Sequence, residues 1–336
     1  LAQLPVVLYQ RFFIASKIGN TAAGLSWDAV SGTFGGGLTG GRSAAMALFI
    51  VVAVTYLMIR WRDRQMKGWR ILGLIALMIP SVFLAEVKVS VIWIAFAGVM
   101  VFGRELIKRP LVAIFAILAL FGLAVGILLA YNAMYYVGTY SSSYDLYEKQ
   151  IGYIFDTNRF NVVTREIGRV ASILFWWTEN RQADLVTVLM GSGPGASRGA
   201  STLAIGEVAR RYSYLVDTST LTALLWDVGL LGALAFVGMG VFAALSAARA
   251  TRNESLTLLQ LNQAEATLLG LLLILSGVAY NRDAVDSFAI QLLLVFFIAS
   301  ALRWSSVSVQ TPPPTVQAKP PAALQRRFAA TTLRRE

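Results

Sequence analysis

Apolar residues follow one another along this chain in seven long runs, separated by short polar segments and by one long polar stretch. The runs are Ala44–Ile59, Ile71–Ala85, Val89–Phe102, Leu111–Tyr135, Leu221–Ala248, Ala266–Tyr280 and Ala284–Leu302. A membrane-spanning helix needs about 20 apolar residues. The pattern therefore predicts an all-α integral membrane protein with about seven spans. The second and third runs form either a tight hairpin with Glu86 and Lys88 at its tip or a re-entrant pair.

The polar segments divide the predicted bundle into five parts. These are 1–43 with a Gly-rich loop, 44–135 with four spans, 136–220 as a long loop, 221–302 with three spans, and 303–336 as a Pro-rich, disordered tail. The Gly-rich loop from Gly32 to Gly41 lacks the Lys-Ser/Thr ending of a nucleotide-binding loop, so we expect a flexible linker rather than an anion site. The first residue is Leu rather than Met, and we expect further helices upstream.

Lys and Arg fix the predicted orientation. They dominate the segments after the first, third, fifth and seventh runs, and these segments fall on one side if each run crosses once. Loops rich in Lys and Arg stay in the cytoplasm. The long loop, in which acidic and basic residues balance, is then extracytoplasmic. This pattern predicts a multi-pass membrane protein whose long loop lies outside the cytoplasm.

Composition narrows the chemistry of the chain. Hydrophobic residues make up 57% and charged residues 14%, and the chain contains neither Cys nor His. Thiolate catalysis, disulfides and His-based proton transfer are therefore excluded. Proton transfer near neutral pH must use a carboxylate, Tyr, Lys or water.

The long polar loop contains a helical stripe of apolar residues with arginines beside it. From Phe160 to Trp177 the apolar spacings are 3, 4, 3, 4 and 3. This period predicts an amphipathic helix, and we expect it to lie on the outer membrane surface. Arg165 and Arg169 are four residues apart, so they would project side by side. They either bind an anionic substrate or only solvate the helix and pair with lipid phosphate.

A Gly-rich turn follows this helix. It runs from Gly191 to Gly195, and Gly allows a ligand to approach the backbone closely. We take Gly193, Gly195 and Arg198 as candidate substrate-binding residues, although Gly-Pro clusters also mark ordinary sharp turns.

Two aspartates follow near the mouth of the fifth run. Asp217 is a candidate base, with N-capping of the next helix as the alternative. Asp227 lies inside the apolar run, where a buried ionisable group is costly and indicates a functional site or an arginine partner. Arg210 and Arg211 precede these aspartates and complete the candidate set.

The order of these features resembles the O-antigen ligase and polymerase superfamily of bacterial envelope glycosyltransferases, including Wzy-like polymerases. The resemblance rests on the spaced arginines, the turn Gly191–Gly195, the pair Asp217-Thr218, and Asp227 two residues before Gly229. It covers residues 70–300. The chain departs from the ligases in lacking a His at the end of the outer loop, which favours a polymerase.

The resemblance implies a GT-C-like fold and a metal-independent transfer of glycan from a polyprenyl diphosphate. Arg165 and Arg169, with Asp217 as base, would be catalytic. The substrate-binding residues would be Arg198, Arg210, Arg211, Gly193, Gly195, Glu86, Lys88 and Asp227. The implied partners are a polyprenyl-diphosphate-linked oligosaccharide, a chain-length regulator and the bilayer. We expect no cofactor, no metal and no nucleic-acid partner.

Two alternatives stay open from the sequence. A ligase would move finished glycan to a lipid or protein acceptor. A transporter or flippase would carry out no chemistry, but transporters place charge deep in several spans, whereas deep charge here is nearly confined to Asp227.

Overall fold

The chain is described here from a computed structural model. The structure describes residues 2–15, 17, 29–35, 42–111, 156–158, 160, 165, 167–199, 204–212, 214–253 and 255–307, with single positions between 112 and 130. Its regular elements are helices, and an isolated β-bridge joins Phe160 and Ile167. The predicted all-α class is therefore confirmed for this part of the chain.

Three of the described helices are long and apolar enough to cross a membrane. They are α4 (Ser43–Arg62), α13 (Gly229–Ala250) and α14 (Leu258–Val278). At 1.5 Å per residue, about 20 residues cover a hydrocarbon layer of about 30 Å. The apolar parts of α5 (Gly68–Leu84), α6 (Val89–Lys108) and α16 (Phe288–Val307) are shorter. The structure thus supports three of the seven predicted crossings, and most of the fourth predicted run lies outside the described residues.

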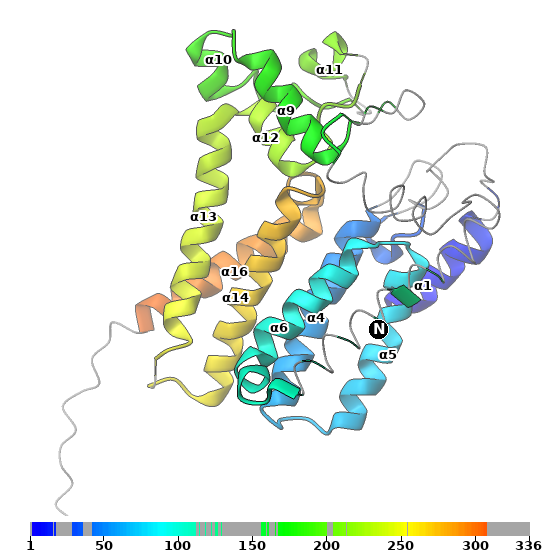
Figure 1. The fold of residues 1–336 in the computed structure, drawn as a ribbon, viewed down its shortest axis with the longest axis vertical. Helices are drawn as coiled ribbons and strands as arrows, with labels where there is room; N and C mark the ends of the chain where they lie inside the picture. The colour runs from blue at the N-terminus through cyan, green and yellow to red at the C-terminus, as the bar shows by residue number, and fades with distance from the viewer. Residues whose placement is uncertain are drawn as a thin grey trace, which may run out of the picture.

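The long helices share two common ends (Figure 1). At one end, the Thr220 amide donates to the Asn281 carbonyl at 2.7 Å, which places the start of α12 (Thr220–Asp227) beside the segment that follows α14. Trp93 of α6 stacks edge-on against Tyr280 at the same end, with ring centroids 6.3 Å apart. We call this the cap end, because α9 (Arg169–Asn180), α10 (Leu185–Met190), α11 (Glu207–Arg211) and α12 gather there.

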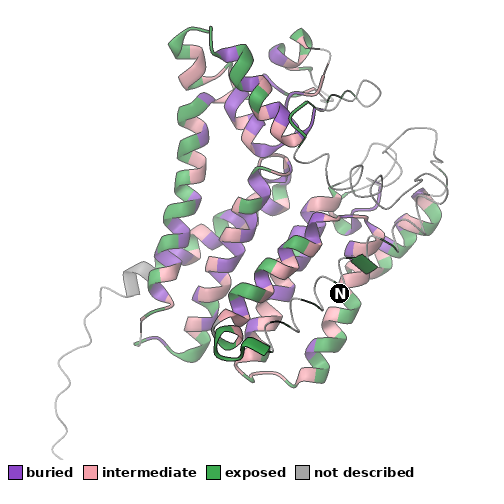
Figure 2. Cartoon of the chain, in the orientation of Figure 1, coloured by how far each residue is buried: buried purple, intermediate pink, exposed green. Residues whose placement is uncertain are grey.

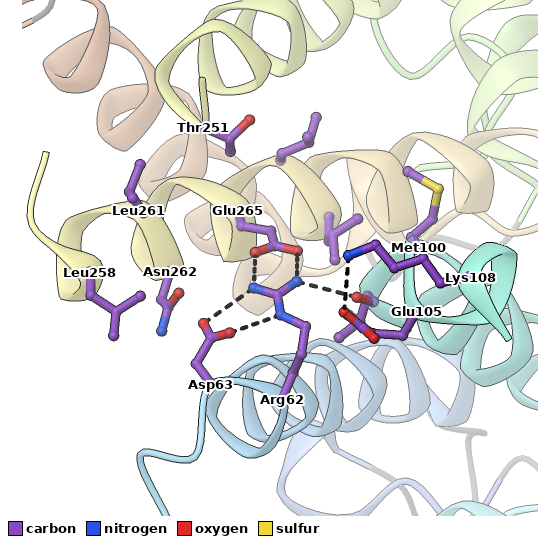
Figure 3. A pocket seen from close by; sticks show the side chains of 13 residues that line it. Arg62, Asp63, Met100, Glu105, Lys108, Thr251, Leu258, Leu261, Asn262 and Glu265 are labelled. Atoms are coloured by element: carbon purple, nitrogen blue, oxygen red, sulfur yellow. Dashed lines mark hydrogen bonds and ion pairs between the residues drawn. The ribbon is translucent and has the colours of Figure 1, made fainter. Parts of the chain in front are cut away.

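At the opposite end of the bundle, which we call the basic end, one arginine links three helices. Arg62, in the last turn of α4, donates to both oxygens of Glu265 on α14 at 2.5 and 2.6 Å, to Asp63, and to the Val101 carbonyl of α6 (Figure 3). Lys108 and Thr251 line the same cavity of about 520 Å³. The basic segments that follow α4, α6 and α13 therefore meet at one end, as the charge pattern predicted.

The fifth apolar run is not one helix. Helix α12 ends at Asp227, and α13 begins at Gly229, whose φ is +68°. The prediction that Asp227 lies inside a membrane span is therefore wrong, because α12 ends at Asp227 and the chain bends at Val228 before α13 begins. Large apolar residues of α13, including Leu234 and Phe242, are exposed, and Figure 2 shows exposed residues along the outer surface of this helix, whereas the residues that it buries are all small. Small residues let membrane helices approach closely.

The segment before α4 is more ordered than the linker prediction supposed. A short α1 (Gln3–Tyr9) continues into the π-helix η1 (Gln10–Ala15), and η2 (Gly32–Phe34) follows. The Gln10 carboxamide accepts from the amides of Ser31 and Gly32 and donates to the carbonyls of Gly32 and Gly35. The start of the Gly-rich loop is therefore held in place, while residues 36–41 lie outside the described part.

Candidate functional site

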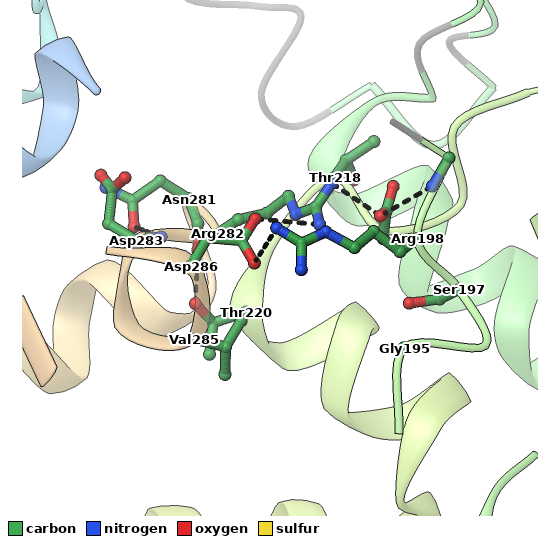
Figure 4. A network of polar contacts seen from close by, with 12 residues as sticks. Gly195, Ser197, Arg198, Thr218, Thr220, Asn281, Arg282, Asp283, Val285 and Asp286 are labelled. Carbon is green, nitrogen blue, oxygen red and sulfur yellow. Dashed lines mark hydrogen bonds and ion pairs between the residues drawn. The ribbon is translucent and has the colours of Figure 1, made fainter. Parts of the chain in front are cut away.

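A network of two arginines and two aspartates lies at the cap end. Arg282, in the turn between α14 and α15 (Asp283–Asp286), donates from Nη1 to Asp217 Oδ2 at 2.6 Å and from Nη2 to Asp286 Oδ2 at 2.9 Å. Arg198 Nη2 lies 3.9 Å from the other oxygen of Asp286. Figure 4 shows Arg198 and Arg282 on either side of Asp286. The network joins the loop after α10, the segment before α12 and the turn after α14.

Asp217 is the most enclosed member of this network. Its side chain is 1% exposed. Oδ2 also accepts from the Gly199 amide at 3.4 Å, while Oδ1 is buried without a hydrogen-bond partner among the described residues. Burial raises the pKa of the Asp217 carboxyl, and the charge of Arg282 opposes this rise. The N-capping alternative is wrong, because Ser219 caps α12 in a capping box with Thr222.

Arg198 is the more exposed of the two arginines in the network. Its side chain is 47% exposed, and its separation from Asp286 is long for an ion pair. The backbone holds it in position, because its amide donates to the Gly195 carbonyl at 3.1 Å and its carbonyl accepts from Gly206 at 2.9 Å. A guanidinium that is fixed at its backbone and open at its tip can bind a phosphate in bidentate geometry.

Arg169 and Asp283 lie beside the network. Arg169 begins α9, donates to the Thr218 carbonyl, and stands over the Tyr280 ring at 5.7 Å. Burial raises the pKa of Asp283 to about 6, with Arg42 and Arg169 opposing the rise and Asp286 adding to it. Four guanidinium groups therefore face three carboxyl groups here, and one of these carboxyls titrates near neutral pH, so the local charge favours an anion.

The helix in the long polar loop begins later than the apolar pattern predicted. Phe160 and Ile167 pair in an antiparallel bridge, Arg165 has φ +56°, and α9 begins only at Arg169. The expectation that Arg165 and Arg169 project side by side from one helix is therefore wrong. The carbonyl of Arg165 accepts from the Leu215 amide at 2.7 Å, and its side chain is exposed.

Asp227 organises the Gly-rich turn. Its carboxylate accepts from the amides of Gly195 at 2.9 Å and Ser197 at 2.7 Å, and its carbonyl accepts from Gly193 at 2.9 Å. The hydrogen-bond partners of Asp227 are backbone amides, so the prediction that it orients an arginine is not what the structure shows. The amides of Gly193 and Gly195, expected to meet a substrate anion, are already bonded to this residue.

Close backbone packing explains two of the glycines at this position. A Cβ on Gly191 would lie 2.5 Å from the Gly229 nitrogen, and a Cβ on Gly229 would lie 2.4 Å from Leu189 backbone atoms. Both residues also have positive φ, which L side chains adopt at a cost. The glycine pattern therefore docks α10 on the start of α13.

The other predicted site residues pair with residues outside the network or are exposed. Arg210 and Arg211 are exposed on α11, where Arg211 pairs with Glu207. Glu86 and Lys88 form a pair at 3.5 Å in the turn between α5 and α6, and Glu86 has φ +57°. This short turn agrees with the hairpin prediction.

The aromatic residues of the cap form its core. Trp176 is 5% exposed and donates to the Leu225 carbonyl at 3.1 Å, so it is a core residue rather than a membrane anchor. Trp177 is 61% exposed, as an anchor would be. The Tyr212 hydroxyl donates to Glu179 at 2.9 Å, and burial raises the pKa of Tyr212 to about 12.

Arg282, Asp283 and Asp286 were not among the site residues predicted from the sequence. These residues follow the apolar run Ala266–Tyr280 in a turn that the charge pattern assigns to the same side as the long loop. Their predicted location on the same side of the membrane as Asp217 could have identified them, because it places three ionisable residues within reach of that carboxylate.

Comparisons with protein-family models, with curated proteins and with solved structures found no match to this chain. The geometry of the cap end and the sequence pattern are therefore the basis for a functional proposal.

Proposed function

We propose that this chain is a membrane glycosyltransferase, which polymerises or transfers glycan repeat units linked to a polyprenyl diphosphate at the outer face of the bacterial cytoplasmic membrane. The proposal includes a GT-C-like bundle with about seven spans and a cap end that faces outward. The observation that carries it is Arg198, half-exposed beside the ion-pair network of the buried Asp217 with Arg282 and Asp286.

The proposed reaction joins an acceptor hydroxyl to the anomeric carbon of the donor glycan. The new glycosidic C–O bond forms as the bond from the anomeric carbon to the diphosphate oxygen breaks, and the polyprenyl diphosphate leaves with the bonding electrons. Negative charge then grows on the leaving group, where a fixed cation lowers the barrier. Arg198 supplies that cation. Arg282 is a positioning residue, because its guanidinium group is already paired with the carboxylates of Asp217 and Asp286.

A carboxylate must take the proton of the acceptor hydroxyl, since the chain has no His. We assign this role to Asp217, whose raised pKa brings it toward the range of a general base. Asp286 is the more accessible carboxylate, with its side chain 23% exposed. Separate substitutions at the two positions decide which one accepts the proton.

The transporter alternative is less well supported. In α4 and α13 the ionisable residues lie in the last turn, and in α14 the single one, Glu265, pairs with Arg62 at the basic end. A transport pathway needs polar groups near the middle of the bilayer. With Asp227 placed at a helix junction, α4 and α13 carry no ionisable residue near their middle. The ligase alternative uses the same site and differs only in the acceptor.

The test is glycan synthesis by purified protein in vesicles that contain a polyprenyl-diphosphate-linked oligosaccharide. We expect Arg198→Ala and Asp217→Asn each to lower turnover at least about 100-fold, the scale for losing a charge-stabilising or acid–base group. Arg181→Ala is the matched control, because Arg181 is exposed in the same cap. Normal turnover in both site variants refutes the assignment. Products that lengthen repeat by repeat indicate a polymerase, and a single transfer indicates a ligase.

A further inference from the structure

A groove opens on the membrane side of the bundle, near the basic end. Helix α14 packs against both α4 and α16, whereas α4 and α16 touch each other little. Residues of α14 such as Ala266 and Thr267 form the floor, and side chains of α4 and α16 form the walls. The groove has a volume of about 450 Å³.

The groove changes in character along its length. Away from the basic end its walls are apolar, with Phe49 and Val52 on α4 and Phe296 and Phe297 on α16. Phe296 is 61% exposed, so this part opens to the surroundings of the bundle. In a membrane, an open apolar groove between spanning helices faces hydrocarbon, which fits an acyl chain.

The mouth of the groove is polar and cationic. Arg303 and Trp304 lie near the end of α16, Gln263 lies near the start of α14, and Tyr56 lies near the end of α4. Arg303 is the one charged residue among the described side chains that line the groove. Arg60 lies one helical turn after Tyr56 on α4 and donates to the Tyr56 hydroxyl at 3.1 Å. The mouth thus presents positive charge and neutral donors at the level of a helix end.

We propose that this groove binds one phospholipid, with its phosphate at Arg303 and one acyl chain between Phe49 and Phe296. The order of features, a cation at the membrane surface with an apolar channel leading inward, matches the order of phosphate and chain in a lipid. Arginine binds phosphate through charge-assisted hydrogen bonds. A bound lipid at this position would fill the space that α4 and α16 leave between them.

Native mass spectrometry of the full chain in mild detergent tests this proposal. The probes are phosphatidylglycerol, diacylglycerol with the same chains but no phosphate, and inorganic phosphate without chains. We expect one phosphatidylglycerol per chain and no retained diacylglycerol or inorganic phosphate. Arg303→Ala removes the cation, and Ala53→Phe fills the groove from α4, where Ala53 lines it. Each variant should weaken binding at least about tenfold.

Matched controls separate the groove from the rest of the surface. Arg249→Ala removes an exposed arginine from the last turn of α13, and Ala235→Phe adds an aromatic ring to the exposed surface of the same helix. Both should bind phosphatidylglycerol like the unsubstituted chain. If Arg303→Ala and Ala53→Phe also bind it unchanged, or if diacylglycerol binds equally well, the proposal is overturned. Thermal unfolding of every variant verifies that it is folded.

Discussion

Removing Arg282 should destabilise the protein in a manner that depends on pH. In the native structure this guanidinium bonds to Asp217, whose side chain is 1% exposed, and to Asp286, whose side chain is 23% exposed. Replacing Arg282 by Met keeps most of the side-chain volume but leaves Asp217 buried without its countercharge. Breaking a buried ion pair from one side costs about 3–5 kcal/mol. Asp286 adds little, because water reaches it.

Protonation of Asp217 sets an upper limit on the loss of folding stability in the Arg282→Met variant. The buried carboxyl can take up a proton, and doing so at a pH above its unfolded pKa of 3.8 costs about 1.4 kcal/mol per pH unit. The limit is therefore about 4 kcal/mol at pH 7 and about 2 kcal/mol at pH 5. The sign follows from linkage. A carboxyl whose pKa is raised on folding binds more protons when folded, so stability falls as pH rises from the unfolded pKa to the folded one.

Equilibrium unfolding in mixed micelles, followed by circular dichroism at pH 5 and pH 7, measures this effect. Arg282→Met should lose more stability at pH 7 than at pH 5. The double variant with Asp217→Asn should recover most of the loss at pH 7, because no buried charge remains. Arg181→Met is the control for loss of an exposed arginine in the cap. An equal loss at both pH values, or no recovery in the double variant, would refute the reasoning.

Three further substitutions test the junction and the site. Gly229→Ala should lower the free energy of unfolding by at least about 2 kcal/mol, because Gly229 has φ +68° and a Cβ there would lie 2.4 Å from backbone atoms. Gly238→Ala is the control, because a Cβ there has open space around it, and its stability should be nearly unchanged in the same unfolding assay. Asp227→Asn should cost about 1–3 kcal/mol by weakening two hydrogen bonds to amides, and a variant as stable as the parent would contradict that role. Asp283→Asn should remove a stability component of about 2–3 kcal/mol that is lost as pH rises through about 6, and a pH–stability curve that keeps its shape would show that Asp283 does not titrate there.

The sequence by itself determined where most of the long helices lie, but not all of their ends. Runs of apolar residues predicted the positions of α4, α5, α6, α14 and α16, because a long apolar stretch can satisfy its backbone polar groups in a membrane only by forming a helix. Helix α14 nevertheless begins at Leu258 rather than Ala266, and the fifth run divides into α12 and α13. The spacing of basic residues likewise predicted that the segments after α4, α6 and α13 share one end. Asp217 and Arg198 were chosen from local patterns, and both lie in the network at the cap end.

Only the tertiary structure decided how those residues are used. The helical period from Phe160 to Trp177 was a true pattern of apolar residues, yet the helix begins only at Arg169, after the isolated bridge between Phe160 and Ile167. Asp227 looked like a buried charge in a span, but a break after α12 turned it toward backbone amides. Likewise, Arg282 meets Asp217 only because α12 packs beside the end of α14. The pattern of neighbouring residues in the sequence indicates which environment a side chain prefers. Which residue it pairs with depends on contacts between segments far apart in the chain, and those contacts form only when the helices pack.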